Sequence, residues 1–194
     1  HFHEQPNTYV TNVEVKVSDL QQSLTYYQDI IGFKVLQQDV NRATLTADGK
    51  TALLTIVQLE TIEQKTSSTS GLYHFALLLP TRRDLANIIT HFRQSGVYFG
   101  ASDHDVSEAL YLRDPDENGI EIYVDRPEND WTWRSDQVHM VTEPLNIPSI
   151  LAEADGQWHG LPANTVMGHI HLSVSSLVAA ETFYTKGLGF DIVT

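Results

Sequence analysis

The feature that most constrains the fold of this chain is an internal repeat. The stretch from Asn12 to Val35 returns as the stretch from His169 to Ile192, each position 157 residues later. Each copy of such a repeat is a supersecondary unit that buries its apolar face only against a neighbour. At the first position the copies differ in chemistry, since Asn12 is replaced by His169. The residues that recur are Val17, Ser18, Leu20, Thr25, Tyr27, Gly32 and Phe33, as Val174, Ser175, Leu177, Thr182, Tyr184, Gly189 and Phe190.

The first copy has the pattern of a strand followed by a helix. Apolar and polar residues alternate from 13 to 18, which is typical of a half-buried strand. Ser18 or Asp19 can cap the next helix, and Gly32 can end it. Strand patterns resume at 33–38 and again over 43–59, where an Asp48-Gly49 turn predicts a hairpin. The expected order is β-α-β-β-β, with one helical face made of Leu20, Leu24, Tyr27 and Ile31.

A second unit of the same plan is predicted from 74 to 127. Residues 60–70 are polar and rich in Ser and Thr, so we expect a loop there. An apolar strand over 74–80 precedes a helix over 81–95 that ends at Gly96. Two closing strands, ALYLRD and IEIYVD, are separated by a turn at 115–119.

The remaining chain divides into a connector and the beginning of a third unit. Residues 128–165 lack a sustained period, apart from a short helix expected over 147–154. The connector carries three tryptophans, Trp131, Trp133 and Trp158, which we expect to pack across the first two units. The third unit begins at 166, and we expect the sequence to stop inside its second strand. The predicted fold is α+β, with tandem βαβββ modules whose mixed sheets curl around a cleft: an N-terminal domain of two paired modules over 1–127, the connector, and an incomplete C-terminal domain over 166–194.

Composition narrows the classes of partner. With 25 acidic and 12 basic side chains the formal charge is −13, which argues against nucleic acid and against an anionic membrane surface. The chain has no cysteine, so disulfides and thiolate metal sites are excluded. No apolar run approaches the roughly 18 residues of a spanning helix, and a signal peptide is not recognisable. We expect a cytoplasmic protein that binds a small molecule.

Three residues of the first two units stand at equivalent sheet edges: Asn12, His74 and Glu121. If paired units form a cleft, their side chains point into one space, where a His, His, Glu set would form a facial triad for a divalent metal. Asn12 is a poor ligand, so His74 and Glu121 are interpreted as a degenerate site or as hydrogen-bonding scaffold. His169 occupies the ligand position of the third unit, whereas His171 matches Glu14 of the first copy and suits a polar-lined site.

A loop histidine, His104, lies between Asp103 and Asp105 and is interpreted as part of a polar loop, because no second residue supports a catalytic role. The sequence has no nucleophile elbow, phosphate-binding loop or HExxH motif.

The repeated stretch, the strand and helix from His74, the segment LYLRDPDENGIEIYVDRP and the phrase GLPANTVMGHIHLSV together resemble the vicinal oxygen chelate superfamily of glyoxalases, bleomycin resistance proteins and extradiol dioxygenases. The resemblance is greatest to the four-module catechol 2,3-dioxygenase type, lacking its C-terminal part. It implies that His169 is the first Fe(II) ligand and that the other two lie beyond Thr194. In the glyoxalase pattern the ligand positions fall on Asn12, Thr55 or a neighbour, His74 and Glu121, of which two match.

The resemblance implies a metal-dependent extradiol dioxygenase, or a related metalloenzyme, that acts on a small molecule with vicinal oxygens. The cofactor would be Fe(II) or another divalent metal, with Mn, Zn or Ni as options. The alternative is a metal-free binding or resistance protein of the same fold, since an acidic surface with aromatic residues suits cationic ligands. In a third interpretation, His74 and Glu121 form the metal site together with His169 of another chain, in a swapped dimer. Apolar strand edges of an incomplete third unit are compatible with a homo-oligomer.

Overall fold

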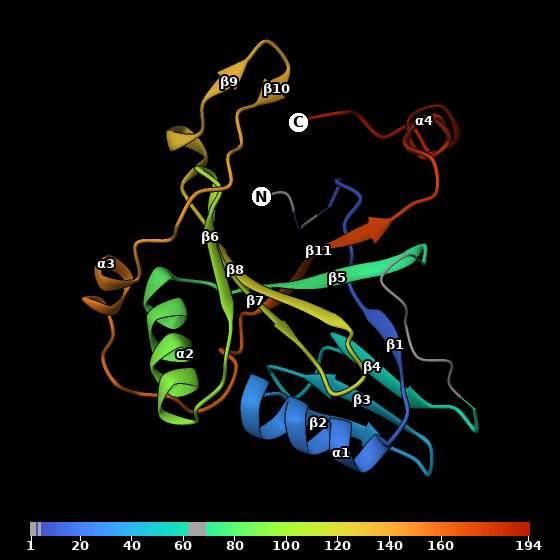
Figure 1. Cartoon of the computed structure of the whole chain (residues 1–194), viewed down its shortest axis with the longest axis vertical. Coiled ribbons are helices and arrows are strands. Elements are labelled where there is room, and N and C mark those ends of the chain that lie inside the picture. The colour runs from blue at the N-terminus through green and yellow to red at the C-terminus, as the bar shows by residue number, and fades with distance from the viewer. Residues whose placement is uncertain (1–2, 4, 62–68) are drawn as a thin grey trace.

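The computed structural model describes residues 3, 5–61 and 69–194. The first unit comprises β1 (Val13–Val17), α1 (Leu20–Thr25), a π-helical turn η1 (Tyr26–Ile31), β2 (Lys34–Gln38), β3 (Arg42–Thr46) and β4 (Leu54–Gln58). Its four strands form a mixed sheet in the order β1-β4-β3-β2, in which only β1 and β4 are parallel. The predicted β-α-β-β-β order is therefore confirmed (Figure 1).

The helix of the first unit ends where the sequence predicts. The Asp19 side chain caps it by accepting a hydrogen bond from the Gln22 amide, and Gly32 adopts a left-handed conformation with φ of 92°. The predicted apolar face, Leu20, Leu24, Tyr27 and Ile31, is buried. The hairpin of β3 and β4 also forms, but its connection is the longer segment 47–53, because the Asp48 carboxylate accepts hydrogen bonds from the Lys50 and Thr51 amides and widens the turn.

The second unit repeats this plan with β5 (Gly71–Leu78), α2 (Arg82–Gln94), β6 (Gly100–Asp103), β7 (Ser107–Arg113) and β8 (Gly119–Asp125). Thr81 caps α2, and Gly96 follows it with positive φ. The two predicted closing strands are confirmed as β7 and β8, and the turn between them spans 114–118, one residue earlier than the predicted 115–119, because Gly119 already pairs with Arg113. Most of the predicted polar loop at 60–70 lies outside the described residues.

The two units are joined through the turn between β7 and β8. Tyr27 of η1 donates a hydrogen bond of 2.8 Å to the buried Asp114 carboxylate. The Ser18 amide donates to Asp116, and the Asn118 side chain donates to the Lys16 carbonyl. One continuous apolar core extends through both units.

The connector is more structured than its sequence suggests. It contains a 3₁₀ turn η2 (Glu128–Asp130), a small hairpin of β9 (Trp133–Arg134) and β10 (Gln137–Val138), and α3 (Ile147–Leu151), which is shorter than the predicted 147–154. Trp158 packs between units as expected and stacks on His91, with ring centroids 4.9 Å apart. Trp133 does not, because it lies on the hairpin that projects from the sheets, where it stacks with Trp131 and is exposed (Figure 1).

The third unit begins with β11 (Val166–Ser173), α4 (Leu177–Thr182) and a second π-helical turn η3 (Phe183–Gly187). Strand β11 joins the sheet of the second unit as a new edge, antiparallel to β5, giving the order β11-β5-β8-β7-β6. Residues 188–194 form no strand, and α4 has no buried residue. Within the described residues, every helix is too short or too polar to cross a membrane.

Candidate metal centre

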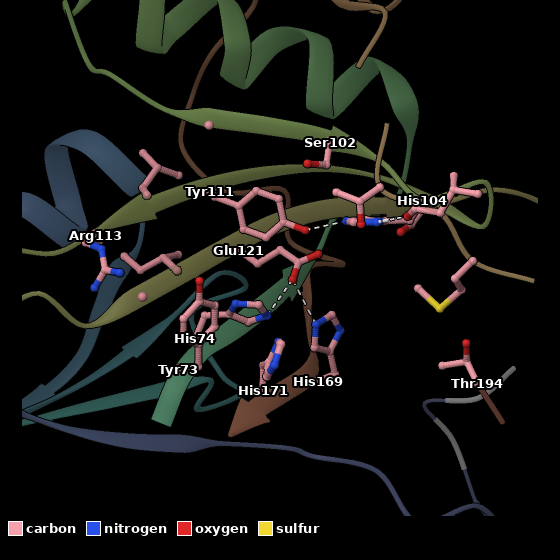
Figure 2. A pocket seen from close by; sticks show the side chains of 18 of the residues that line it. Tyr73, His74, Ser102, His104, Tyr111, Arg113, Glu121, His169, His171 and Thr194 are labelled. Atoms are coloured by element: carbon pink, nitrogen blue, oxygen red, sulfur yellow. Dashed lines mark hydrogen bonds and ion pairs between the residues drawn. The ribbon is translucent and has the colours of Figure 1, made fainter. Parts of the chain in front are cut away.

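Three side chains that could ligate a metal converge on the five-stranded sheet. His74 comes from β5, Glu121 from β8 and His169 from β11, and their candidate ligand atoms all lie within 4.8 Å of one another. Oε2 of Glu121 is 2.8 Å from Nε2 of His74 and 3.1 Å from Nε2 of His169. Figure 2 shows both imidazole rings turned toward this one carboxylate.

Strand register explains why these side chains meet. His169 and Glu121 are both opposite Ala76, one on each neighbouring strand, so their side chains share its face of the sheet. His74 shares that face because it is two residues from Ala76 on the same strand. Ala76 is completely buried, and its methyl group leaves the space above β5 in which the two longer side chains reach each other.

The chemistry of this cluster fits a divalent metal. Two imidazoles and one carboxylate form the donor set that non-haem Fe(II) oxygenases use, with open positions for substrate. Nε2 of His74 is buried and has no hydrogen bond of acceptable geometry, although it lies close to Glu121. A buried polar atom in that condition is costly unless something else satisfies it, and a metal bound between the three side chains would do so.

The electrostatics keep the carboxylate ready to bind a cation. Burial raises the pKa of Glu121, but the hydrogen bond to His169 and the close approach of the His74 ring outweigh it and lower that pKa to about 2. Glu121 is therefore ionised at neutral pH. A carboxylate that is 4 % exposed and ionised requires a positive partner.

The cluster forms one wall of a cavity of about 940 Å³. Its other walls include Tyr73 of β5, Ser102 of β6, Ile120 of β8 and His171 of β11, with Met140 and Val141 of the connector. A cavity of this size, mostly apolar with a few convergent polar groups, is typical of small-molecule sites.

A second polar pair, His104 and Tyr111, lies in the same cavity. Nδ1 of His104 is 2.6 Å from the Val141 carbonyl, which only accepts hydrogen bonds, so this nitrogen carries the proton. Nε2 then accepts a hydrogen bond from the Tyr111 hydroxyl at 2.6 Å, as Figure 2 shows. Burial, together with the charge of Glu121, raises the pKa of Tyr111. Tyr111 therefore holds its proton beside the metal cluster.

Comparison with known proteins identifies the family of this chain. Residues 10–122 match the model of the Glyoxalase/Bleomycin resistance protein/Dioxygenase superfamily. The chain belongs to this superfamily. A catechol-2,3-dioxygenase of Bacillus subtilis (strain 168) is 44% identical to it over 190 residues, which are 96% of this chain and 67% of that protein.

Two further proteins are more distantly similar. Biphenyl-2,3-diol 1,2-dioxygenase 3 of Rhodococcus globerulus is 29% identical over 103 residues, which are 52% of this chain and 54% of that protein. A crystal structure of a glyoxalase/bleomycin resistance protein/dioxygenase from Alicyclobacillus acidocaldarius has a TM-score of 0.50 at 19% identity, covering 63% of this chain and 95% of that one. The second likeness concerns the fold alone.

Measured against the superfamily pattern, the structure groups the expected ligand residues differently from the sequence analysis. His74 and Glu121 were assigned to a degenerate site and His169 to a separate one, whereas the structure brings all three into one cluster within the chain. Asn12 and Thr55, which the glyoxalase pattern marks, are not among the residues that line the cavity. His171 does line the cavity, and its ring centroid is 4.8 Å from that of His74.

Sequence reasoning missed the His104–Tyr111 pair. His104 was interpreted as a loop residue without a partner, but its partner is on the next strand. The predicted turn at 115–119 would have placed Arg113 opposite Glu121. The turn lies one residue earlier, at 114–118, and pairs Arg113 with Gly119 and therefore Tyr111 with Glu121, which puts the phenol beside the carboxylate.

Proposed function

We propose that this chain is an extradiol ring-cleaving dioxygenase that depends on a divalent metal and acts on a catechol-like substrate. The observation that carries the proposal is the His74, Glu121 and His169 cluster on the cavity wall. The 44% identity to a catechol-2,3-dioxygenase supports the same reaction class. Among the metals expected from the sequence, we favour Fe(II), because two imidazoles and a carboxylate are its usual ligands in oxygenases.

In this proposal the three side chains hold the metal, and the rest of the cavity handles the substrate. The bound metal would supply Lewis acidity toward both hydroxyl oxygens of a catechol and the redox chemistry that dioxygen activation needs. The apolar wall formed by Ile120, Met140 and Val141 packs against the aromatic ring and excludes water.

The His104–Tyr111 pair supplies proton transfer. The neutral Nε2 of His104 accepts from the Tyr111 hydroxyl, so it can take up a proton that this hydroxyl relays from a substrate oxygen. The bond from His104 Nδ1 to the Val141 carbonyl fixes the ring in the required tautomer. Because the pKa of Tyr111 is raised, the phenol acts as a neutral donor and relay and does not compete as an anionic ligand.

Metal loading followed by an oxygen assay tests the proposal. The metal-free chain is titrated anaerobically with Fe(II) and, separately, with Mn(II), and bound metal is measured by elemental analysis. Catechol is then added with dioxygen, and oxygen uptake is followed together with the mass of the product. We expect about one metal per chain and a product equal in mass to catechol plus both atoms of dioxygen.

Variants assign the activity to the site. His169→Ala and Glu121→Ala should lose metal binding and oxygen uptake, because the cavity then keeps too few ligands. His159→Ala is the matched control, since His159 is an exposed connector residue outside the cavity wall. Unchanged metal content in His169→Ala would refute the assignment. A wild-type chain that binds catechols but no metal would support the alternative, a metal-free binding protein.

A further inference from the structure

The sheet position of His169 depends on an irregularity in β11. Met167 is opposite Leu77 and His169 is opposite Ala76, so two residues of β11 advance while β5 advances by one. Gly168 is the extra residue of this bulge. Because side chains alternate between faces, a shift of one residue moves every later side chain to the other face.

Without the bulge, the residue opposite Ala76 would be Gly168, and His169 would face the apolar core. Met167 is buried in that core with 1 % exposure, so before the bulge its side chain marks the face of β11 that packs on the core. After the bulge, His169 and His171 both lie on the face of the cavity. Bulges are used near active sites to re-aim a side chain in this way.

Gly168 has a steric reason to be glycine. A Cβ at this position would lie 2.2 Å from the Tyr123 hydroxyl oxygen, and 2.6 and 2.8 Å from two carbons of its ring. The φ of Gly168 is not in the left-handed range, so the backbone alone would accept alanine. The close approach of Tyr123 is therefore what excludes a side chain.

Tyr123 has little freedom to move away. It is 5 % exposed and packs in a small cluster with Ala76 and Ala109 on the same sheet. Its ring also contacts His169, with centroids 5.1 Å apart. A side chain added at 168 must therefore displace β11, which is the edge strand.

We infer that Gly168 is a positioning residue: because it has no side chain, β11 can lie against the Tyr123 ring, and this sets His169 in the metal cluster. Relief of the 2.2 Å contact to an ordinary 3.4 Å requires a shift of about 1.2 Å. Metal–ligand distances tolerate only about 0.2 Å. The adjacent His169 would therefore leave its place near Glu121. This inference rests on the proposed metal centre.

Gly168→Ala, Tyr123→Leu and the double variant test the inference, with Co²⁺ as the probe. Bound Co²⁺ is followed by its visible absorption, which reports coordination, and the melting temperature of each metal-free protein is measured separately. We expect Gly168→Ala to weaken Co²⁺ binding by about 10–100-fold and to change the spectrum. In the Tyr123→Leu background the same substitution should cost little, because the clashing ring is gone. Gly187→Ala is the matched control, since its nearest contact is 3.8 Å.

The outcomes separate this inference from the proposed function. If the wild-type chain binds no Co²⁺, the metal centre itself is wrong. If the wild-type chain binds it and Gly168→Ala binds equally well, the positioning role is wrong while the centre stands. Equal losses from Gly168→Ala with and without Tyr123→Leu would also overturn the role. If Gly168→Ala alone fails to fold, the double variant decides, since relief of the clash should restore both folding and Co²⁺ binding, and failure of either overturns the role.

Discussion

The contact between Tyr27 and Asp114 holds the first two units together, and its removal should be measurable. Tyr27 is fully buried in η1, and its hydroxyl donates to an Asp114 carboxylate that is 3 % exposed. Tyr27→Phe keeps the aromatic ring in the core and deletes only this donor. Asp114 keeps three other donors, the amides of Asp116 and Asn118 and the side chain of Asn118.

The magnitude follows from the nature of the acceptor. A hydrogen bond to a charged group contributes about 1.5–3 kcal/mol. Because the remaining donors still satisfy Asp114, we expect a loss near 2 kcal/mol in the free energy of unfolding. For a chain of this length that corresponds to a fall of about 4–8 °C in melting temperature.

Urea unfolding and calorimetry of the metal-free protein measure this loss. Tyr26→Phe is the matched control, because it changes the neighbouring tyrosine, whose hydroxyl has no hydrogen bond to any described residue. The control should change stability by less than about 0.5 kcal/mol. Equal effects of the two substitutions, or no effect of Tyr27→Phe, would refute the argument that this bond secures the units.

Three other substitutions test the metal site, the ion pairs and the connector. Ala76→Leu should fill the space between the ligands and reduce bound metal at least tenfold, and full metal content would contradict that role. Asp103 accepts two hydrogen bonds of 2.7 Å from Arg126, which lower its pKa below 3.8 although burial opposes this. The stability that the ionised Asp103 contributes is present above pH 3.8 and is lost as pH falls through the lowered pKa. Asp103→Asn should therefore lower the free energy of unfolding by about 1–3 kcal/mol at pH 7, measured by urea unfolding, and by progressively less below pH 3.8. Gly32→Ala should destabilise more than Gly49→Ala in thermal unfolding: both glycines have positive φ, but only a Cβ at Gly32 would lie 2.8 Å from connector backbone.

Much of the fold was predictable because it depends on local patterns. Alternation predicted β1, helical spacing predicted α1, and Gly32 ended that helix in the conformation that glycine adopts most easily. The three candidate ligands were also identifiable one by one, because His74, Glu121 and His169 lie in segments whose pattern predicts a strand, and the structure places each of them within one.

That these three side chains lie in one cluster was not predictable, because it depends on pairing between strands that are distant in the sequence. Nothing local states that β11 adds to the edge of β5, and the bulge at Gly168 inverts the face that simple alternation would assign to His169. The burial of Asp114 against Tyr27 likewise arises only when the second unit packs on the first. Such contacts are set by tertiary packing, which period and propensity do not encode.

The addition of β11 to the second unit's sheet also has a temporal consequence. His169 lies 48 residues after Glu121, and at the usual pace of ribosomal synthesis that interval lasts roughly 2–10 s. During this time a nascent chain presents an imidazole and a carboxylate but no third donor. Binding of the proposed metal would therefore wait until β11 has emerged and docked, so cofactor acquisition would report that this strand has reached its place in the sheet.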